Sequence, residues 1–384
     1  MNVREIVRAN NAFYCMDCGK CTSVCPVSSQ HLDFSPRRAV TSTLSGAASG
    51  VLPVEDLSLC LTCGRCANVC PARVDYLGFT QGMRCAMAQE GEHIVCSHGG
   101  IMQNLMRLMA SGCDGQAMRR LDWVPEGAKT AASGELLYFT GCLPFYDAYF
   151  THLDMDTLKI ARDTLRILNA LGETPVLLAG ELCCGHDLYW SGDEANAARL
   201  ARKNLAAIAA SGAKRIVTAC PECAYTLREL YPRLTGNTAP YVVQHIAEFL
   251  AEKQDAGALK LSKRSGRIVY HDSCRLSRQL GVTDQPRRAL RAVYGDGLKE
   301  MEHSGPDAVC CGTNGWLHCH SVSRRLQDSR LKEAATAGAK TLVTACPKCQ
   351  IHLRCAQAGG KDETLKRLKV TDLVSVVAEA IDGG

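Results

Sequence analysis

Signals for membrane insertion and for export are missing from this chain of 384 residues. No apolar stretch is long enough to span a bilayer, because lysine or arginine interrupts each candidate. The N-terminal sequence MNVREIVRANNAFYC lacks the apolar core of a secretory signal. We therefore expect a cytoplasmic protein that is not itself transmembrane and that reaches the inner face of a membrane only through a partner.

The sequence also has little net charge and lacks the glycine-rich motif of dinucleotide-binding folds. The net charge is only +5, and the basic residues are scattered among nearly as many acidic ones, so the sequence shows no nucleic-acid footprint. No G-x-G-x-x-G motif stands at a strand-to-helix junction, which leaves the chain without a flavin or nicotinamide fingerprint. If this chain moves electrons, a partner must supply them.

Cysteine, in contrast, is abundant: the chain has 23, and 18 of them fall into four spaced arrays. Thiols stay reduced in the cytoplasm, so this density indicates metal ligation rather than a disulfide scaffold, which a chain of this size does not need. The adjacent pairs Cys183–Cys184 and Cys310–Cys311 also argue against an extracellular disulfide protein. We interpret the cysteines outside the arrays as small buried hydrophobes. They are Cys85, Cys96, Cys113, Cys319 and Cys355.

Two of the arrays are C-x2-C-x2-C-x3-C-P runs, the signature of double-cluster ferredoxins. The first is Cys15, Cys18, Cys21 and Cys25 before Pro26, and the second is Cys60, Cys63, Cys66 and Cys70 before Pro71. Three cysteines of a run wrap one cubane cluster, and the fourth ligand comes from the other run. The predicted ligand sets are therefore Cys15, Cys18, Cys21 and Cys70, and Cys60, Cys63, Cys66 and Cys25. Structural zinc is disfavoured, because zinc sites usually separate two Cys-x-x-Cys pairs.

The segments around these runs favour a helical domain over a short β-hairpin ferredoxin. Few residues between the runs look extended, and PRRAVTSTL (36–44) suits a helix. Lys20 and Arg65 hold matching positions inside the two runs, where they would tune the clusters or meet an acidic partner. Residues 101–109 have apolar side chains at helical spacing, and we interpret their methionines as packing residues rather than ligands. A polar linker follows around 123–134.

The other two arrays each combine a lone cysteine, a Cys-Cys-Gly motif and a Cys-x-x-Cys pair. They are Cys142, Cys183, Cys184, Cys220 and Cys223, and Cys274, Cys310, Cys311, Cys346 and Cys349. Five thiolates are one more than a cubane uses, and adjacent cysteines could reach two sides of a larger or opened cluster. Gly185 and Gly312 would let the backbone pass close to the metal. On spacing alone, an ordinary cubane with a spare thiol remains open.

The part of the chain that carries these two arrays is an internal duplication. RIVTACPECAYTL (215–227) matches TLVTACPKCQIHL (341–353), and ELCCGHDLYWSG (181–192) matches AVCCGTNGWLHC (308–319). Each cysteine of the second copy lies 126 to 132 positions after its counterpart, and the seam between the copies is 251–266. In each copy β-rich runs alternate with helical segments, which predicts a largely parallel sheet with cysteines at the strand ends.

The predicted strands include 215–219 and 341–345, with β-rich runs at 136–142 and 267–274, and the predicted helices are 156–171, 193–210 and 324–337. The fold class is α+β multidomain: an N-terminal helical double-cluster ferredoxin domain followed by two duplicated α/β Cys-Cys-Gly domains. The predicted boundaries are 1–93 for the ferredoxin domain, 94–135 for a packing helix and linker, 136–262 for the first Cys-Cys-Gly domain and 263–384 for the second.

On these motifs the chain resembles the Cys-Cys-Gly family, best known from the catalytic subunits of heterodisulfide reductases. The gaps of 40 and 35 residues in the first copy, and of 35 and 34 in the second, are similar to the pattern that holds a non-cubane [4Fe-4S] cluster in that family. A ferredoxin part ahead of the duplication resembles the membrane-linked, single-chain type of the enzyme. Relatives in glycerol-3-phosphate, glycolate and lactate oxidation commonly have one degraded repeat, whereas all ten cysteines are present here.

The resemblance implies four [4Fe-4S] clusters, two cubane and two non-cubane, in an iron–sulfur oxidoreductase subunit of the heterodisulfide reductase type. Electrons would arrive through the cubanes, and a disulfide would be cleaved or formed between the two non-cubane clusters. The alternative is an electron-relay subunit of a flavin-linked dehydrogenase that passes electrons to a quinone or another carrier. The expected partner is a flavoprotein of the heterodisulfide reductase type or a membrane cytochrome b, and the expected substrate is a disulfide or thiol.

Histidines next to the arrays complete the predicted site. His186 follows the first Cys-Cys-Gly motif, and we count it among the catalytic residues together with the ten cysteines of the two arrays. His186 or His271 could protonate a product thiolate, and a hydrogen bond to local backbone or to a cluster sulfur is the alternative role. His318 and His320 flank Cys319, and we interpret them as the polar start of a helix.

Overall fold

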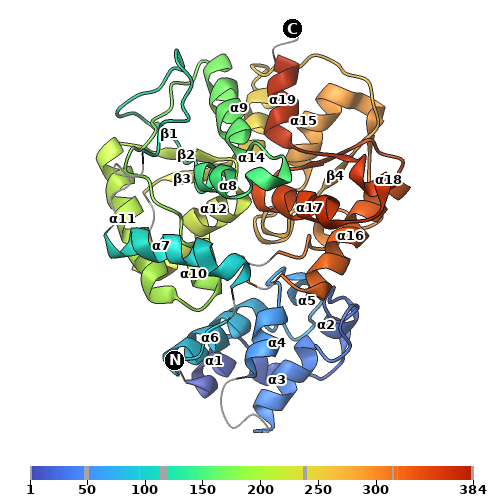
Figure 1. Ribbon diagram of the computed structural model, residues 1–384. Helices are drawn as coiled ribbons and strands as arrows, with labels where there is room; N and C mark the ends of the chain where they lie inside the picture. The colour runs from blue at the N-terminus through green and yellow to red at the C-terminus, as the bar shows by residue number, and fades with distance from the viewer. Residues whose placement is uncertain are drawn as a thin grey trace.

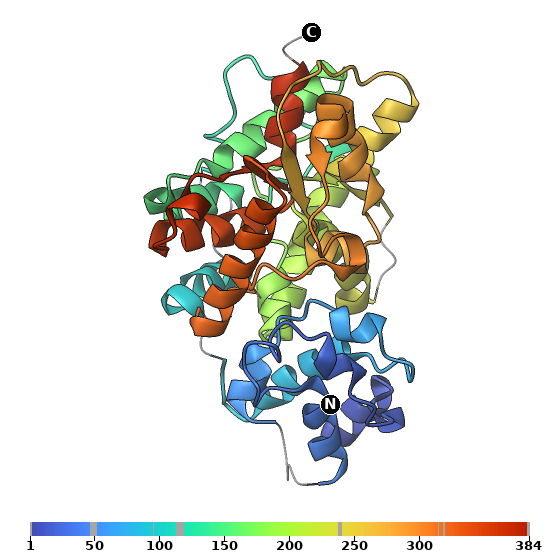
Figure 2. The ribbon, with the colours of Figure 1, turned by 90° about the vertical axis from the view of Figure 1, so that its right-hand side faces the viewer.

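The computed structural model describes residues 2–46, 52–94, 96–112, 119–236, 240–313, 315–317 and 319–381. Its N-terminal domain lies beneath two α/β units that stand next to each other (Figure 1). In the view turned by 90° the same domain again lies below both units (Figure 2). Within the described ranges, no helix is both long and apolar enough to cross a bilayer.

The N-terminal domain is helical, as predicted, and its described residues up to Ile94 contain no strand. The helix predicted at 36–44 is α3 (Pro36–Leu44), where the side chain of Ser35 accepts a hydrogen bond from the Arg38 amide and Pro36 occupies the first helical turn. The other helices of this domain are α1 (Val3–Ala9), η1 (Ala12–Tyr14), α2 (Lys20–Ser23), α4 (Val54–Leu59), α5 (Arg65–Asn68) and α6 (Tyr76–Gln89).

The segment between this domain and the repeats packs onto the first repeat. It begins with η2 (Ser97–Gly100) and α7 (Ile101–Ser111). Met102, Met106 and Met109 of α7 are buried in the core of the first repeat, which confirms that they are packing residues. Further on, Trp123 is buried and meets Tyr138 edge to face, with the ring centroids 6.3 Å apart. The predicted linker therefore contributes to the core of the repeats.

The first repeat is built on a parallel sheet with the strand order β1-β2-β3. Leu137 pairs with Ile216, which pairs with Val243, and all three side chains are buried, as expected for short strands covered on both faces. The elements of this repeat are β1 (Leu136–Tyr138), α8 (Leu143–Tyr149), η3 (Thr151–Leu153), α9 (Thr157–Ala170), α10 (His186–Trp190), α11 (Glu194–Ser211), β2 (Arg215–Thr218), α12 (Pro221–Tyr225), η4 (Thr226–Leu230), α13 (Tyr231–Thr235), β3 (Val242–His245) and α14 (Ile246–Asp255).

The second repeat has a parallel sheet with the order β5-β4-β6-β7. Val269, Leu342 and Val370 pair across it in the same way and are buried. Its elements are β4 (Ile268–His271), η5 (Arg275–Gln279), α15 (Asp284–Tyr294), η6 (Gly295–Gly297), β5 (Leu298–Lys299), η7 (Gly305–Asp307), α16 (Ser321–Thr336), β6 (Thr341–Thr344), α17 (Pro347–Gly359), α18 (Glu363–Lys366), β7 (Lys369–Asp372) and α19 (Leu373–Ile381).

Capping residues explain where the predicted helices begin and end. α9 starts after Asp156, whose side chain accepts from the Lys159 amide, and it ends just before Gly172, which has a φ of +80°. α16 starts at Ser321, three residues before the predicted position, because the ring of His320 accepts a hydrogen bond from the Val322 amide. His320 thus begins a helix as interpreted, whereas His318 and Cys113 lie outside the described residues.

The two repeats share one hydrophobic core, because two helices of the first repeat pack on two helices of the second in symmetric contacts. α9 of the first repeat packs on α19 of the second (Figure 1), and α14 of the first packs on α15 of the second. α9 and α15 hold equivalent places in the two repeats, as do α14 and α19, so the contacts are related by a pseudo-two-fold axis. The equivalent pair Tyr138 and Tyr270 is buried in this common core. The symmetry also places Cys220, after β2, near enough to Cys346, after β6, for the two thiols to interact.

Candidate metal centres

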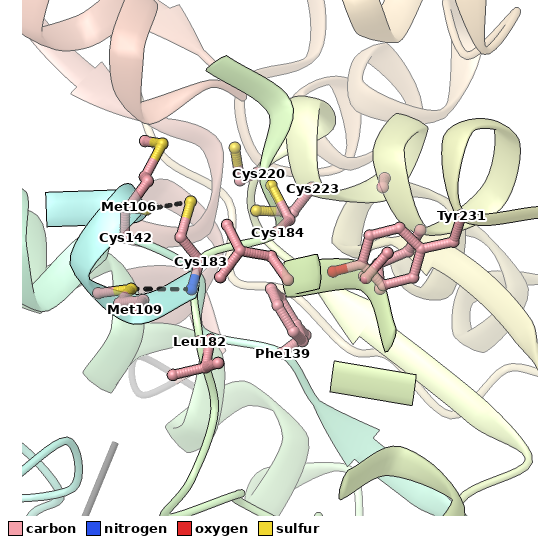
Figure 3. Packing of buried hydrophobic residues seen from close by; sticks show 14 of the residues in the cluster. Met106, Met109, Phe139, Cys142, Leu182, Cys183, Cys184, Cys220, Cys223 and Tyr231 are labelled. Carbon is pink, nitrogen blue, oxygen red and sulfur yellow. Dashed lines mark hydrogen bonds between the residues drawn. The ribbon is translucent and has the colours of Figure 1, made fainter. Parts of the chain in front are cut away.

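The first array collects five thiols at the strand ends of the first repeat. Cys142 precedes α8, Cys183 and Cys184 precede α10, and Cys220 and Cys223 begin α12. The Sγ atoms of Cys142 and Cys183 are 3.2 Å apart, and thiol contacts continue from Cys183 to Cys184, Cys223 and Cys220. Figure 3 shows these side chains gathered beside Met109, whose sulfur accepts a hydrogen bond from the Cys183 amide. All five cysteines are buried, so their sulfur atoms form a row that is shielded from solvent.

The second array repeats this row in the same order. Contacts run from Cys274 to Cys310, Cys311, Cys349 and Cys346, and the Sγ atoms of Cys311 and Cys349 are 3.3 Å apart. Cys274 is half-buried and the other four are buried. The structure therefore brings together all five predicted cysteines of each copy, including both members of each adjacent pair.

Glycines leave room for the sulfur atoms. A Cβ atom on Gly141 would lie 2.8 Å from the Sγ atom of Cys223. Gly185 and Gly312 follow the two adjacent pairs with φ values of +86° and +85°, a backbone conformation that other residues rarely adopt. A Cβ atom on Gly312 would also lie 3.0 Å from the carbonyl oxygen of Ser323. The predicted role of Gly185 and Gly312 is thus explained by backbone conformation, and Gly141 is an additional glycine with the same effect.

The thiol rows fit a bound iron–sulfur group. A hydrogen bond with Cys183 and burial both raise the pKa of the Cys142 thiol, and contacts with Cys311 and Cys346 together with burial raise the pKa of Cys349. Contacts with neighbouring thiols instead lower the pKa of Cys183 and of Cys311, so each row combines thiols that favour the thiolate with thiols that stay protonated when free, although iron binds the thiolate form. The positive charge of iron would offset this cost, and five converging soft donors suit iron–sulfur chemistry.

The second ferredoxin-type run meets one cysteine of the first run. Cys25, Cys60, Cys63 and Cys66 line one small cavity, which is also bordered by Tyr76. This is the set predicted from the spacing of the two runs. Burial raises the pKa of the Cys25 thiol to about 12, so this set also favours a metal-bound thiolate over a free one.

The first ferredoxin-type run has the same backbone conformation but is more open. Gly19 and Gly64, at matching positions, both have a φ of +79° and begin α2 and α5. Cys18 is exposed to solvent, whereas its counterpart Cys63 is buried. The Cys70 sulfur accepts a hydrogen bond from the Val74 amide at 3.4 Å, and its assignment to the first set stays a prediction.

A buried cluster of charges joins the two arrays. Glu222 and Lys348 occupy the variable position of the two Cys-Pro-x-Cys turns, one in each repeat, and Lys348 Nζ lies 2.5 Å from Glu222 Oε2. Lys348 also forms an ion pair with Asp187, and its side chain is only 1% exposed. Asp187 in turn accepts from Nδ1 of His186 at 2.8 Å. Opposite charges at duplicated positions were visible in the sequence, but they did not identify this pair.

This cluster is charged despite its burial. Although burial would raise the pKa of Asp187, the Lys348 ammonium and His186 hold it well below its usual range. Although burial would lower the pKa of Lys348, the carboxylates of Asp187 and Glu222 raise it well above its usual range. Carboxylate and imidazole atoms of His186, Asp187 and Glu222 lie close enough to hold a cation, and the Lys348 ammonium is that cation.

The two candidate histidines are held as neutral side chains. Nδ1 of His186 contacts Asp187, and its Nε2 accepts a hydrogen bond from Arg275 Nε at 3.0 Å. Burial lowers the pKa of His186, and burial with the nearby Arg330 lowers the pKa of His271 to about 3. Both histidines border an array, and their lowered pKa favours an orienting role over proton donation. Nε2 of His271 is buried and has no hydrogen-bond partner among the described residues.

The interpretation of the remaining cysteines as buried hydrophobes is wrong for Cys319 and holds only in part for the other described ones, since Cys96 and Cys355 pack against the hydrophobic cores. Cys319 is exposed, and Cys85, Cys96 and Cys355 are only partly buried. Cys85 lies at the edge of a cleft of about 830 Å³ between α6 and the start of α11, where its thiol contacts Glu194. None of the described array cysteines lines this cleft.

Two domain families match the chain. The family described as cysteine-rich domain matches residues 136–228 and 268–354, once in each repeat. The family described as 4Fe-4S dicluster domain matches residues 11–74, which include every cysteine of the two ferredoxin-type runs. The matched ranges thus contain all four arrays.

Several named relatives are similar to this chain in sequence. The chain is 34% identical over 269 residues to one of the subunits of dihydromethanophenazine:CoB–CoM heterodisulfide reductase from Methanosarcina barkeri. It is 31% identical over 259 residues to EtfAB:quinone oxidoreductase from Syntrophomonas wolfei, and 28% identical over 265 residues to a Bacillus subtilis protein named as the probable iron-sulfur-binding oxidoreductase FadF. These alignments cover 68%, 65% and 68% of this chain. They span only 63%, 34% and 36% of the three relatives.

Proposed function

Because this chain belongs to the family of iron–sulfur proteins with cysteine-rich domains, here in two copies behind a 4Fe-4S dicluster domain, we propose that it cleaves or forms a disulfide as a heterodisulfide reductase-like oxidoreductase subunit. The observation that carries this proposal is the pair of complete thiol rows, equal in order and joined through the Glu222–Lys348 contact. Conduction alone needs no second complete row. Two rows next to each other provide one place for each sulfur of a disulfide.

We propose four clusters in this chain. Two cubanes would be held by Cys15, Cys18, Cys21 and Cys70, and by Cys60, Cys63, Cys66 and Cys25. Two non-cubane clusters would be held by the two rows of five thiols, one in each repeat. When bound, the clusters would supply one-electron transfer and iron atoms that bind sulfur.

The chain's own residues would build a closed and fixed site around them. Gly141 lets the backbone approach the Cys223 sulfur, and Gly185 and Gly312 provide the positive φ that follows each adjacent pair. Lys348 ties the two Cys-Pro-x-Cys turns together, so the separation of the rows is set by a buried ion pair rather than by flexible loops. His186 would keep its proton on Nδ1, facing Asp187, because Nε2 accepts from Arg275.

The electron partner would be a flavoprotein of the heterodisulfide reductase type or a membrane cytochrome b. The relatives support a partner of one of these kinds, since one is named for oxidation of dihydromethanophenazine and another for EtfAB and quinone. The exposed Cys18 makes the first ferredoxin-type run the more accessible of the two for such a partner.

An electron-relay subunit of a flavin-linked dehydrogenase is the second candidate function. The similarity to the EtfAB:quinone oxidoreductase favours it, because that name describes electron transfer to a quinone without a disulfide. The two proposals share the cubanes and differ in what the two thiol rows do.

Anaerobic iron analysis followed by turnover assays separates these functions. The disulfide proposal expects about 16 irons per chain, against about eight for a dicluster ferredoxin on an inert scaffold. It also expects the protein to oxidise reduced methyl viologen with the CoB–CoM heterodisulfide, and Cys184→Ser to abolish this while dithionite still reduces the cubanes. If Cys184→Ser kept both the heterodisulfide turnover and the reduction of its cubanes, the disulfide proposal would be contradicted. Quinone reduction by the wild type would then support the relay.

A further inference from the structure

A single turn of helix connects the second thiol row to the second ferredoxin-type run. η5 follows Cys274 directly and carries Arg275, Arg278 and Gln279. Arg275 donates from Nη1 to the carbonyl oxygen of Thr62 at 3.0 Å and from Nη2 to its Oγ1 atom at 2.8 Å. Gln279 donates to the same carbonyl at 3.1 Å. The loop that holds Cys60 and Cys63 is therefore bound to the residues that follow Cys274.

Arg278 lies between cysteines of both sites. Its Nε donates to the carbonyl oxygen of Cys63 at 2.7 Å, and its Nη1 donates to the carbonyl oxygen of Ala308 at 2.6 Å, two residues before Cys310. Its charge interacts with the thiols of Cys63, Cys274 and Cys310. Arg278 Nη2 is buried and has no hydrogen-bond partner among the residues that the structure describes. Arg278 itself is partly exposed, but a buried guanidinium N–H without a partner is the kind of donor that a cluster sulfur accepts.

The first repeat has no such connection at the equivalent place. The positions 132 residues earlier, after Cys142, are Leu143 and Tyr146. The buried Arg120 lies near Cys142 and its Nη1 also has no hydrogen-bond partner among the described residues, but its charge is balanced by Glu181 at 2.6 Å. The acidic Asp187 lies near Cys183 and is paired with Lys348 of the second repeat. The two thiol rows are thus equal in ligands and unequal in charge.

We propose that Arg278 is a positioning residue that raises the reduction potentials of two neighbouring clusters, the cubane of the second run and the cluster of the second row. This inference rests on the proposed clusters, and it makes the second row the point at which electrons enter the duplicated domains. A positive charge and a hydrogen-bond donor beside a cluster both stabilise its reduced form, which carries one more negative charge. Because Arg278 touches both sites, it would raise the potentials of both clusters, whereas the first row receives no such contribution from it.

Redox titration of the holoprotein, followed by EPR, tests this role without any turnover. Arg278→Gln removes the charge while keeping a polar side chain, and we expect two of the four clusters to become harder to reduce. At a fixed potential the ratio of reduced to oxidised cluster should fall roughly tenfold for each, which equals 59 mV for a one-electron couple. Arg278→Lys keeps the charge and should recover most of the shift.

A matched control is Arg325→Gln. Arg325 also joins the second repeat to the N-terminal domain, donating to Oε1 of Gln30 at 3.1 Å and to its carbonyl oxygen at 2.7 Å, but it lies at the surface. This variant should leave all four potentials unchanged. An equal shift in Arg325→Gln would show that loss of domain contact, not charge, changes the potentials, and would overturn the proposal.

Two further outcomes would also overturn it: unchanged potentials in Arg278→Gln, or an identical shift in Arg278→Lys. If Arg278→Gln does not bind its full iron, Arg275→Gln serves instead, because Arg275 also interacts with Cys274, and it should give a smaller shift in the same direction. No shift there contradicts the proposal. Absence of disulfide turnover would sink the proposed function but would leave these potentials, and hence this inference, standing.

Discussion

The two repeats hold the same five thiols in the same order, but their non-ligand residues differ in charge. In the first repeat, Glu222 lies in the Cys-Pro-x-Cys turn and Asp187 follows the Cys-Cys-Gly motif. In the second, Lys348 lies in the turn and Arg278 follows the lone cysteine by one helical turn. The comparison shows that ligand geometry is set by the duplicated backbone, whereas asymmetry is set by a few side chains between the ligands. Mutations at equivalent positions can therefore separate the two contributions.

The ligands themselves should give the largest effects. Cys184→Ser and its counterpart Cys311→Ser each remove one sulfur from the middle of a row, and each should lower disulfide turnover by more than about 100-fold, since even outer-shell changes cost 10- to 100-fold. Iron analysis and EPR should show loss of one cluster in each case, with the cubane signals kept. Near-normal turnover in one of the two variants would show that the rows are not equivalent in function.

The Lys348 ion pairs should matter for stability, because Lys348 is the cation for two buried carboxylates. Lys348→Gln leaves the carboxylates of Asp187 and Glu222 buried without the lysine ammonium, which should lower the free energy of unfolding by about 3–5 kcal/mol. Anaerobic denaturant titration of the holoprotein measures this. The exposed pair of Lys366 with Glu363 is the control, and Lys366→Gln should cost at most about 1 kcal/mol. Equal effects of the two substitutions would show that the buried cluster does not hold the repeats together.

The repeats should respond to pH in opposite directions, because the equivalent strands β3 and β7 end in different buried residues. Burial lowers the pKa of His245, at the end of β3, to about 4, and burial raises the pKa of Asp372, at the equivalent end of β7, to about 7. His245 folds as the neutral form, so its contribution is present above pH 6.5 and is lost as the pH falls towards 4. Asp372 folds protonated, so its contribution is present below pH 3.8 and is lost as the pH rises through 7.

Each contribution is on the order of 3 kcal/mol. Asparagine at either position keeps an acceptor for the helix that follows, as Asp372 provides for the Val374 amide. His245→Asn should therefore remove a rise in stability between pH 4 and 6.5, and Asp372→Asn should remove a fall between pH 3.8 and 7. Calorimetric unfolding of the holoprotein over this range would decide it. A wild-type profile unchanged by Asp372→Asn would mean that this carboxyl group is not held protonated.

The smallest difference concerns the two glycines after the adjacent cysteines. Alanine at either position must adopt a positive φ, which costs roughly 1–2 kcal/mol. Gly312→Ala should cost about 1 kcal/mol more than Gly185→Ala, because its Cβ would lie 3.0 Å from a backbone oxygen rather than at an ordinary contact distance of 3.4 Å. Thermal unfolding of the two variants measures the difference. Equal midpoints would show that the second repeat can relax around the added methyl group.

The sequence predicts the grouping of the thiols and the repeat plan because both depend on local spacing. The Cys-Pro-x-Cys turns, the strands before them and α3 (Pro36–Leu44) all lie where spacing and capping residues place them. The charges between the rows could not be predicted this way, since Lys348 and Asp187 are 161 positions apart and Arg278 meets Cys63 across 215. Nor could the exposure of Cys319 be predicted, because cysteine is apolar enough for either environment.

The exchanged contacts of α9 with α19 and of α14 with α15 give the duplicated part the geometry of a tethered dimer. Each repeat buries helix faces that would be exposed if it stood alone, so neither half is complete by itself. The seam keeps the two repeats at an effective concentration in roughly the millimolar range. Burial of their shared apolar core then stabilises the association. If the backbone is cleaved within 256–266, we therefore expect the two fragments to stay associated and to elute together from a size-exclusion column.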